Sequence, residues 1–426
     1  MSRPAPGSMR LAVTAATDAL REVIPLTAPA DVALSRFFRA HPELGSRDRA
    51  FVAESVYGVL RHRASLAWLA PDAPLRRTVL AERMRHGGLS IRDLEPGTKP
   101  DDPEWLATIK GRSLDDAPLA VRTELPDWVL ERILPSMGDA DVLALARGLC
   151  RGAPLDLRVN TVRAERDAVL AQLRGEGLDA AATPFSPVGI RLGGHPPVNR
   201  HPLFLDGTIE VQDEGSQILG FLLAPKRRDT VVDFCAGAGG KTLLIGALMR
   251  SQGRLYAFDV SDARLQKLGP RLARSGLSNV HPQRIESEND ARVTRIAGKV
   301  DRVLVDAPCS GLGTLRRNPD LKWRQSPEAL VELVDRQTRI LDAAATLLRP
   351  GGRLVYATCS ILPEENDAIA DAFLARHPGF AEIDCSAALA TSGMALDTGP
   401  RLRLRPDIHG TDGFFAAAFE RRSDAG

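Results

Sequence analysis

The sequence predicts an α/β protein whose C-terminal part, residues 226–426, folds as a doubly wound, Rossmann-like sheet. In this part of the chain, apolar runs of strand length alternate with helical patterns. A glycine-rich turn joins the first of these strands to the first helix, between Val231 and Thr242. A later run, Val300 to Asp306, is apolar enough to be a parallel strand buried on both faces. Open sheets of this kind bind their ligands at the carboxyl ends of the strands.

The composition of the 426 residues is that of an ordinary globular protein with room for two or three domains. The formal net charge is only +2, so a nucleic-acid-binding surface would have to come from local clusters of arginine. No apolar run reaches membrane-spanning length, and Met1 to Pro6 lack the apolar core of a signal peptide. We therefore expect a cytoplasmic monomer without a membrane partner.

The cysteines give no sign of a disulfide framework or a metal site. Cys150, Cys235, Cys309, Cys359 and Cys385 form no even, closely spaced set. Without an export signal they are expected to be reduced thiols. None lies in a Cys-x2-Cys pair, and the eight histidines lack ligand spacing, so no metal is expected.

Residues 1–124 are expected to form an all-α domain. Between residues 9 and 70, apolar residues recur at helical spacing, beginning with Leu11, Val13, Ala16, Leu20 and Val23. A further helix is expected from Ser46, whose side chain suits an N-cap, to Arg61. Proline-rich breaks between Pro96 and Pro103 interrupt the later helices.

Residues 125–225 mix strand and helix patterns, which predicts a small α+β domain. An alternating strand from Leu155 to Thr161 precedes a helix from Arg163 to Gly175, and shorter strands follow. A helix that opens at Gln212 and reaches Leu222 then leads into the doubly wound sheet.

The glycine-rich turn predicts a nucleoside site. Residues 235–242 let the backbone approach a ligand closely, and the helix start offers free N–H groups. The next strand ends at Asp259, where a carboxylate can accept hydrogen bonds from ribose hydroxyls. A triphosphate-binding loop would need a glycine in place of Cys235, and a dinucleotide loop would need one in place of Thr242. The turn therefore favours a nucleoside site of another kind.

Two cysteines follow neighbouring strands of the expected sheet. Cys309 comes just after the strand that ends at Asp306, and Cys359 follows a strand over residues 351–358. A helix over residues 327–348 precedes the second of these strands, and a final strand is expected over residues 412–419. A buried cysteine is usually an inert small side chain, so position alone leaves catalysis and packing as equal interpretations.

Four motifs, which follow one another along the chain, resemble those of a known family. They are Cys235-Ala236-Gly237-Ala238-Gly239-Gly240-Lys241-Thr242, Asp306-Ala307-Pro308-Cys309-Ser310-Gly311, Asn318-Pro319-Asp320-Leu321-Lys322-Trp323 and Tyr356-Ala357-Thr358-Cys359-Ser360. Together they resemble the Sun-type (RsmB-like) RNA (cytosine-5) methyltransferases throughout residues 226–426. The family's usual proline before Gly-Gly-Lys is Ala238 here. Residues 46–61, with their Tyr-Gly-Val-Leu-Arg run, resemble the NusB-like RNA-binding domain; an arginine-rich amphipathic helix without an RNA role is the alternative.

The resemblance implies methyl transfer from S-adenosylmethionine to carbon 5 of a cytosine in RNA, with 16S ribosomal RNA expected and tRNA as an alternative. It implies that Cys359 is the nucleophile, that Asp306 hydrogen-bonds the pyrimidine edge, and that Cys309 assists product release. Lys241 reaches into the active site in this family. In DNA cytosine methyltransferases the Pro-Cys cysteine attacks, which would make Cys309 the nucleophile instead.

The resemblance also assigns the cofactor contacts. Asp259 would hold the ribose and Glu286 the adenine, although Ser287, Glu288 and Asp290 share its loop. The remaining cofactor-binding residues would be Cys235, Ala236, Gly237, Ala238, Gly239, Gly240, Lys241 and Asp306. Phosphate contacts and a stacking face for RNA are expected from Arg316, Arg317, Lys322 and Trp323, unless Trp323 belongs to a core. A different class of answer is a non-catalytic RNA-binding ribosome-assembly factor with the same fold.

Overall fold

The computed structural model describes residues 8–423, which form two compact units. Unit 1 is Met1–Gly152 together with Thr314–Pro327, and unit 2 is Ala153–Gly313 together with Glu328–Gly426. The division into domains at residues 124 and 225 stays a prediction. The segment from Met1 to Pro6, on which the expected absence of an export signal depends, lies outside the described residues.

Unit 1 is helical, as the spacing of its apolar residues predicts. Its helices are α1 (Met9–Val23), α2 (Ala30–Ala40), α3 (Ser46–Arg61), α4 (Arg63–Leu69), α5 (Leu75–Arg85), α6 (Ile91–Leu94), α7 (Asp102–Gly111), α8 (Leu119–Thr123), α9 (Asp127–Ile133), α10 (Asp139–Cys150) and α17 (Leu321–Arg324), with 3₁₀ turns η2 (Glu95–Gly97) and η3 (Leu134–Ser136). Helix α3 has the expected bounds, but its N-cap is Gly45 and not Ser46. Leu11 was also assigned wrongly, because it lies on the solvent face of α1 and is 49% exposed. The NusB-like character of this unit stays a prediction.

Residues 314–327 come late in the sequence but pack inside unit 1. Lys322 Nζ donates to Arg61 O at 2.7 Å, and Trp323 Nε1 donates to Leu60 O at 2.7 Å. These carbonyls belong to the last turn of α3, where no intrahelical donor reaches them. The late segment therefore caps the end of an early helix.

The smaller sheet of unit 2 is antiparallel, with the order β2-β3-β1-β4. Its elements are β1 (Leu155–Val159), α11 (Arg166–Gly175), β2 (Ala180–Ala182), β3 (Gly189–Leu192), η4 (Val198–Arg200), α12 (Pro202–Leu205) and β4 (Ile209–Val211). The α+β pattern is present as expected. The sequence did not indicate β2, because three alanines carry no strand signal.

The larger sheet of unit 2 has the order β10-β12-β9-β8-β5-β6-β7, with β11 beside β12. Its strands are β5 (Thr230–Asp233), β6 (Arg254–Asp259), β7 (Val280–Arg284), β8 (Val300–Asp306), β9 (Leu348–Thr358), β10 (Phe380–Ile383), β11 (Leu402–Leu404) and β12 (Phe414–Arg421). Strands β5 to β9 are parallel, and β12 runs antiparallel to β9. The predicted doubly wound, Rossmann-like sheet is confirmed.

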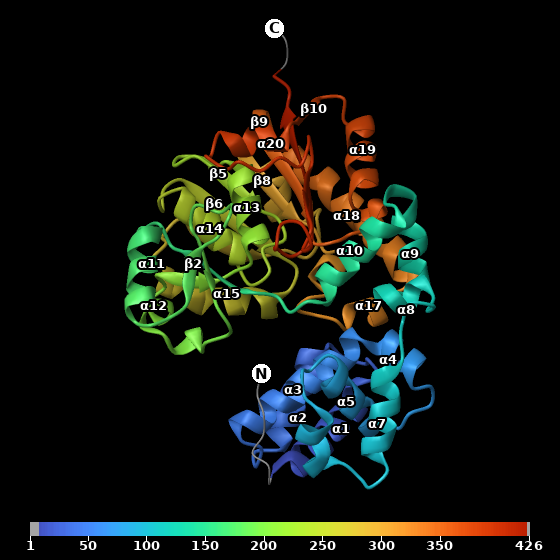
Figure 1. The fold of residues 1–426 in the computed structure, drawn as a ribbon. Helices are drawn as coiled ribbons and strands as arrows, with labels where there is room; N and C mark the ends of the chain where they lie inside the picture. The colour runs from blue at the N-terminus through green and yellow to red at the C-terminus, as the bar shows by residue number, and fades with distance from the viewer. Residues whose placement is uncertain (1–7, 424–426) are drawn as a thin grey trace. The chain divides into compact units, whose positions relative to one another are not determined.

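Helices cover both faces of this sheet, and they pack against alternate side chains of the strands (Figure 1). Leu304 of β8 packs with α14, whereas Val303 and Val305 pack with α18. The helices are α13 (Glu214–Leu223), α14 (Gly240–Leu248), α15 (Asp262–Ser275), α16 (Ala291–Thr294), α18 (Pro327–Leu347), α19 (Asp367–Arg376) and α20 (Cys385–Ala390). The strand order reverses between β5 and β8, so the crevice at their carboxyl ends is where such sheets bind ligands.

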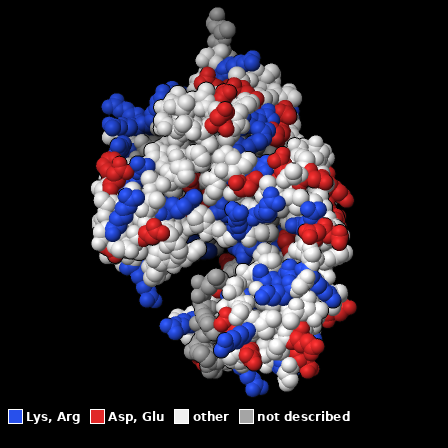
Figure 2. Space-filling model, viewed as in Figure 1, with Lys and Arg blue, Asp and Glu red and all other residues white. Residues whose placement is uncertain are grey.

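The molecular surface carries both signs of charge. On the face shown in Figure 2, Lys and Arg side chains are interspersed with Asp and Glu, as a net charge of +2 leads one to expect. No helix within residues 8–423 is long and apolar enough to cross a membrane.

Candidate active site

The glycine-rich turn between β5 and α14 has the backbone conformation that only glycine adopts readily. Gly237 and Gly239 have φ values of 56° and 80°. A Cβ atom on Gly239 would lie 2.1 Å from Leu268 Cδ1, whereas one on Gly237 would meet nothing within 4 Å. Gly239 is therefore needed for packing, and Gly237 leaves open space where the backbone faces the crevice.

Two arginines hold the carbonyls of this turn. Arg158 of β1 is fully buried and donates to Gly240 O at 2.6 Å. Arg271 of α15 donates to Ala238 O at 2.6 Å and forms an ion pair with Glu210. Ala238, where the family has proline, is thus fixed by a side chain instead of a ring. This contact could not be predicted from local sequence, because both arginines come from distant segments.

Asp259 ends β6 and is oriented by the turn itself. Its Oδ2 accepts from Gly237 N at 2.8 Å, and its Oδ1 accepts from Ser261 N at 2.7 Å. Two backbone donors leave further lone pairs on both oxygens, which suits recognition of a ribose diol. Asp259 lines a cavity of about 900 Å³, which Glu286, Asp306, Cys309 and Cys359 line as well.

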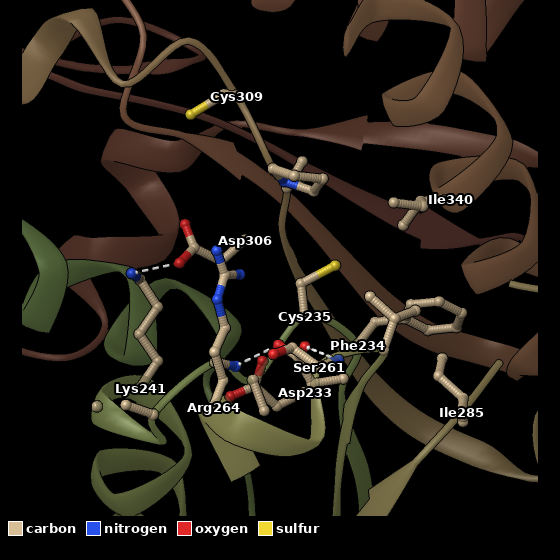
Figure 3. Close-up of a pocket in the computed structure, with 18 of the residues that line it drawn as sticks. Asp233, Phe234, Cys235, Lys241, Ser261, Arg264, Ile285, Asp306, Cys309 and Ile340 are labelled. Atoms are coloured by element: carbon tan, nitrogen blue, oxygen red, sulfur yellow. Dashed lines mark hydrogen bonds and ion pairs between the residues drawn. The ribbon is translucent and has the colours of Figure 1, made fainter. Parts of the chain in front are cut away.

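Lys241 and Asp306 form an ion pair at the carboxyl ends of β5 and β8 (Figure 3). The Nζ–Oδ2 distance is 2.6 Å. Burial lowers the pKa of Lys241. Asp306 and, to a smaller extent, Cys359 raise the pKa by more than burial lowers it, so that it lies above its ordinary value. The lysine is therefore a fixed positive charge that interacts with Cys359.

The two cysteines meet at this point. The Sγ atoms of Cys309 and Cys359 are 3.4 Å apart, and both side chains are half-buried. The hydrogen bond with Cys359 and burial raise the pKa of Cys309 well above its usual range. The two sulfurs therefore lie close enough to act on one bound base.

Asp233 is a residue of the site that the sequence did not single out. It lies at the end of β5, is 1% exposed and lines the cavity. Its Oδ2 accepts from Thr242 Oγ1 at 2.6 Å, whereas its Oδ1 has no hydrogen-bond partner among the described residues. Burial raises the pKa of Asp233 to about 7. An unsatisfied buried oxygen beside an open glycine backbone fits a cationic ligand group.

The acidic loop after β7 offers several carboxylates to the cavity. Glu288 forms an ion pair with Arg339, and Asp290 accepts from the backbone at the start of α16. Glu286 lines the cavity and stays the proposed adenine contact. Cys235 also lines the cavity. Burial raises the pKa of its thiol well above the usual range, so this part of the cavity lining is uncharged.

Two of the expected RNA contacts, Arg316 and Lys322, are corrected by the structure, whereas Arg317 is half-buried and stays a prediction. Lys322 is 2% exposed and Arg316 is 5% exposed, so neither side chain presents a charge to solvent. Burial lowers the pKa of Lys322. Trp323 is half-buried and hydrogen-bonded to α3, which agrees with the alternative that it belongs to a core.

The cavity suits the cofactor expected from the resemblance. Asp233 and the open backbone at Gly237 would face the methionine part of S-adenosylmethionine, and Asp259 its ribose. Ile285 and Ile340 add apolar walls of the kind an adenine ring packs against. Within residues 8–423 no group of three or more His, Cys, Asp and Glu side chains is placed to hold a metal ion.

Comparisons with known proteins agree with this geometry. Residues 220–420 match the family described as 16S rRNA methyltransferase RsmB/F, and residues 125–199 match the ferredoxin-like domain of RsmF/B-like methyltransferases. The probable ribosomal RNA small subunit methyltransferase B of Synechocystis sp. is 32% identical, over 94% of this chain and 97% of its own. Ribosomal RNA small subunit methyltransferase B of Sodalis glossinidius is 33% identical, over 90% and 92%. The crystal structure of PH0851 has a TM-score of 0.77 at 25% identity, over 98% of this chain and 99% of that one.

The resemblance drawn from the four sequence motifs is thereby confirmed, as is the cofactor, S-adenosylmethionine. The glycine turn, Asp259 and the paired cysteines all lie within the residues that the family match covers. The chain belongs to the RsmB/F family of 16S rRNA methyltransferases.

Proposed function

We propose that this protein methylates carbon 5 of a cytosine in 16S ribosomal RNA through a covalent bond between Cys359 and the pyrimidine. The observation that carries the proposal is the 3.4 Å approach of Cys309 and Cys359 at the edge of a cavity that also holds Lys241 and Asp306. S-adenosylmethionine supplies an electrophilic methyl group when it is bound. The remaining chemistry belongs to the side chains.

Carbon 5 of cytosine is a weak nucleophile, so it has to be activated by addition of a thiolate to carbon 6. Cys359 forms this bond, and the electron pair of the carbon 5–carbon 6 double bond moves into the ring. The Asp306 carboxylate accepts a hydrogen bond from the cytosine amino group, and from ring nitrogen 3 once that nitrogen is protonated as the sulfur adds. Lys241 stabilises the thiolate before addition and holds the Asp306 carboxylate in place.

The second cysteine completes the cycle. After carbon 5 has gained the methyl group, it still carries its original proton. Transfer of this proton to a base returns the electron pair of the carbon–hydrogen bond to the carbon 5–carbon 6 bond and expels Cys359 as a thiolate. Cys309 is assigned to this release step, because its Sγ lies beside that of Cys359. The opposite assignment, with Cys309 as nucleophile, requires a thiolate at the cysteine whose pKa is raised.

The target cytosine is expected to be unpaired or flipped out of its helix, because a base inside a stem cannot expose carbon 6 to a thiolate. Unit 1 is proposed to contribute to RNA binding. The names of the relatives favour ribosomal RNA over tRNA as the substrate. Cytoplasmic location and a monomeric state complete the proposal.

The test is transfer of tritiated methyl groups to deproteinised 16S ribosomal RNA, followed by bisulfite mapping of the product. One protected cytosine is the expected result. Label at another base, or in tRNA alone, would overturn the substrate assignment. Stoichiometric RNA binding without label would support a ribosome-assembly factor instead.

A further inference from the structure

Glu365 takes no part in the chemistry described above, but it is hydrogen-bonded to the residues that follow the two cysteines. Glu365 ends the 3₁₀ turn η6 (Pro363–Glu365), which comes shortly after β9 and Cys359 in the chain. Its side chain is completely buried. Burying a carboxylate costs free energy unless hydrogen bonds replace those it made with water. The partners of Glu365 therefore indicate what this side chain does.

One side of the carboxylate holds the Cys309 segment. Glu365 Oε1 accepts from Ser310 N at 2.8 Å, and Oε2 accepts from Ser310 Oγ at 2.5 Å. Ser310 is the residue directly after Cys309. A backbone and a side-chain bond to one residue fix the position of its peptide unit, and so of the cysteine before it.

The same carboxylate also holds the Cys359 segment. Glu365 Oε2 accepts a short hydrogen bond from Ser360 Oγ, and Ser360 is the residue directly after Cys359. The hydroxyl oxygens of Ser310 and Ser360 are 3.0 Å apart. One buried side chain thus joins the two segments that carry the sulfurs.

Helix α18 anchors the carboxylate to the rest of the sheet. Gln337 Nε2 donates to Glu365 Oε1 at 2.9 Å and to Pro308 O at 3.0 Å. Tyr356 of β9 donates to the main-chain oxygen of Glu365 at 2.6 Å. The donors that surround the side chain are uncharged, so its role is to accept several hydrogen bonds at once and not to neutralise a cation.

We propose that Glu365 is a positioning residue that sets the separation of Cys309 and Cys359. This inference rests on the proposed roles of the two cysteines. The adding sulfur and the release sulfur act on neighbouring carbons of one ring, so their spacing has to match the substrate in both steps. A misplacement of about 1 Å costs about 100-fold in rate, which is the size of effect expected when the shared carboxylate is lost.

The first test is kinetic and uses the full chain. In Glu365→Gln the amide NH₂ would face the two hydroxyls that now donate to the carboxylate, while the side chain keeps its shape. Methyl transfer to 16S ribosomal RNA should fall about 100-fold in kcat, with KM for S-adenosylmethionine within about twofold of the wild type. Ser310→Ala combined with Ser360→Ala keeps the glutamate but removes both hydroxyl bonds, and should give the same pattern.

The second test measures the spacing of the sulfurs directly. Oxidised dithiothreitol accepts two electrons from the thiols of Cys309 and Cys359, which lose their protons and form a disulfide, while the reagent becomes a dithiol. The equilibrium gives the effective concentration of one sulfur at the other, read from peptide mass spectra. We expect it to fall at least about tenfold in Glu365→Gln, because effective concentration depends steeply on geometry.

The control is Asp229→Asn, which removes a buried carboxylate at the opposite end of the sheet. Asp229 accepts from Lys226 N and pairs with Arg302, away from both cysteines. This variant should lower stability without changing kcat or the disulfide equilibrium. Unchanged values in Glu365→Gln, or equal losses in Asp229→Asn, would overturn the proposal. A wild-type protein that transfers no methyl group would overturn the proposed function instead, and the disulfide equilibrium would still decide the role of Glu365.

Discussion

Lys241 Nζ lies 2.6 Å from Asp306 Oδ2, and this ion pair joins the first turn of α14 to the end of β8. The pair places a positive charge near Cys359 and a carboxylate near the expected pyrimidine edge. Lys241 also lies 5.4 Å from the ring of Phe414, in the closing Asp-Gly-Phe-Phe segment. The lysine therefore contacts two segments that are far apart from it and from each other in the sequence.

Replacement of Lys241 by methionine is expected to lower methyl transfer by about 100-fold, the usual cost of removing one preorganised charge or donor. The same change should slow alkylation of Cys359 by iodoacetamide, because less of the thiol would be ionised. Rates are measured by label transfer and by peptide mass spectrometry. The exposed Lys267→Met is the matched control in the same unit. Equal alkylation rates in both variants would contradict the proposed role.

Substitution of each cysteine separates their roles. Cys359→Ala should be inactive and form no covalent complex with RNA, because the adding sulfur is gone. Cys309→Ala should accumulate a protein–RNA adduct that survives denaturing electrophoresis. An adduct in Cys359→Ala and none in Cys309→Ala would reverse the assignment.

Binding of S-adenosylmethionine should tighten as the pH rises from 6 to 8. Burial raises the pKa of Asp233 to about 7, so this carboxyl is mostly protonated at pH 6 and mostly ionised at pH 8. A cationic ligand favours the ionised form, and the apparent Kd should fall about tenfold over this range, in proportion to the ionised fraction. Isothermal titration calorimetry measures the change, and Asp233→Asn should bind weakly without the pH dependence. A constant Kd in the wild type would exclude this carboxylate from the cofactor site.

Unit 1 should lose stability as the pH rises from 6.5 to 8. Burial raises the pKa of Glu82 to about 8, so the folded state keeps a proton that the unfolded state has already lost. The free energy of unfolding should therefore decrease by about 2 kcal/mol across this interval. Burial lowers the pKa of His62 to about 2 and that of His86 to about 4, so these residues act only at lower pH. Amide hydrogen exchange in α3 and α5 measures the effect, and Glu82→Gln should abolish it.

Much of the doubly wound sheet and its ligand edge could be predicted from the sequence. Strand β8 has the predicted bounds, because an apolar run flanked by aspartates indicates a buried parallel strand. Asp259 and the glycine turn were also predictable, because they are local features with one strand and one helix around them. Cys309 and Cys359 could be expected at one edge, since parallel neighbouring strands end there.

The rest of the site depends on contacts between distant segments, and the sequence carries no local signal for these. Lys322 was expected to reach RNA, because a lysine side chain can contact phosphate. The structure buries it against α3 instead. Glu365 and Arg158 likewise depend on partners more than fifty residues away, Ser310 and Gly240 respectively.

The packing of residues 314–327 onto helix α3 determines when, during translation, the helices of unit 1 can complete their hydrogen bonds. Helix α3 leaves the ribosome long before Lys322 and Trp323 have been translated, so the carbonyls of Leu60 and Arg61 stay hydrated until then. The amino-terminal helices can pack together early. Their hydrogen bonds to Lys322 and Trp323 can form only after some 260 further residues have been translated. Nascent-chain experiments should find this unit protease-sensitive until translation has passed residue 327.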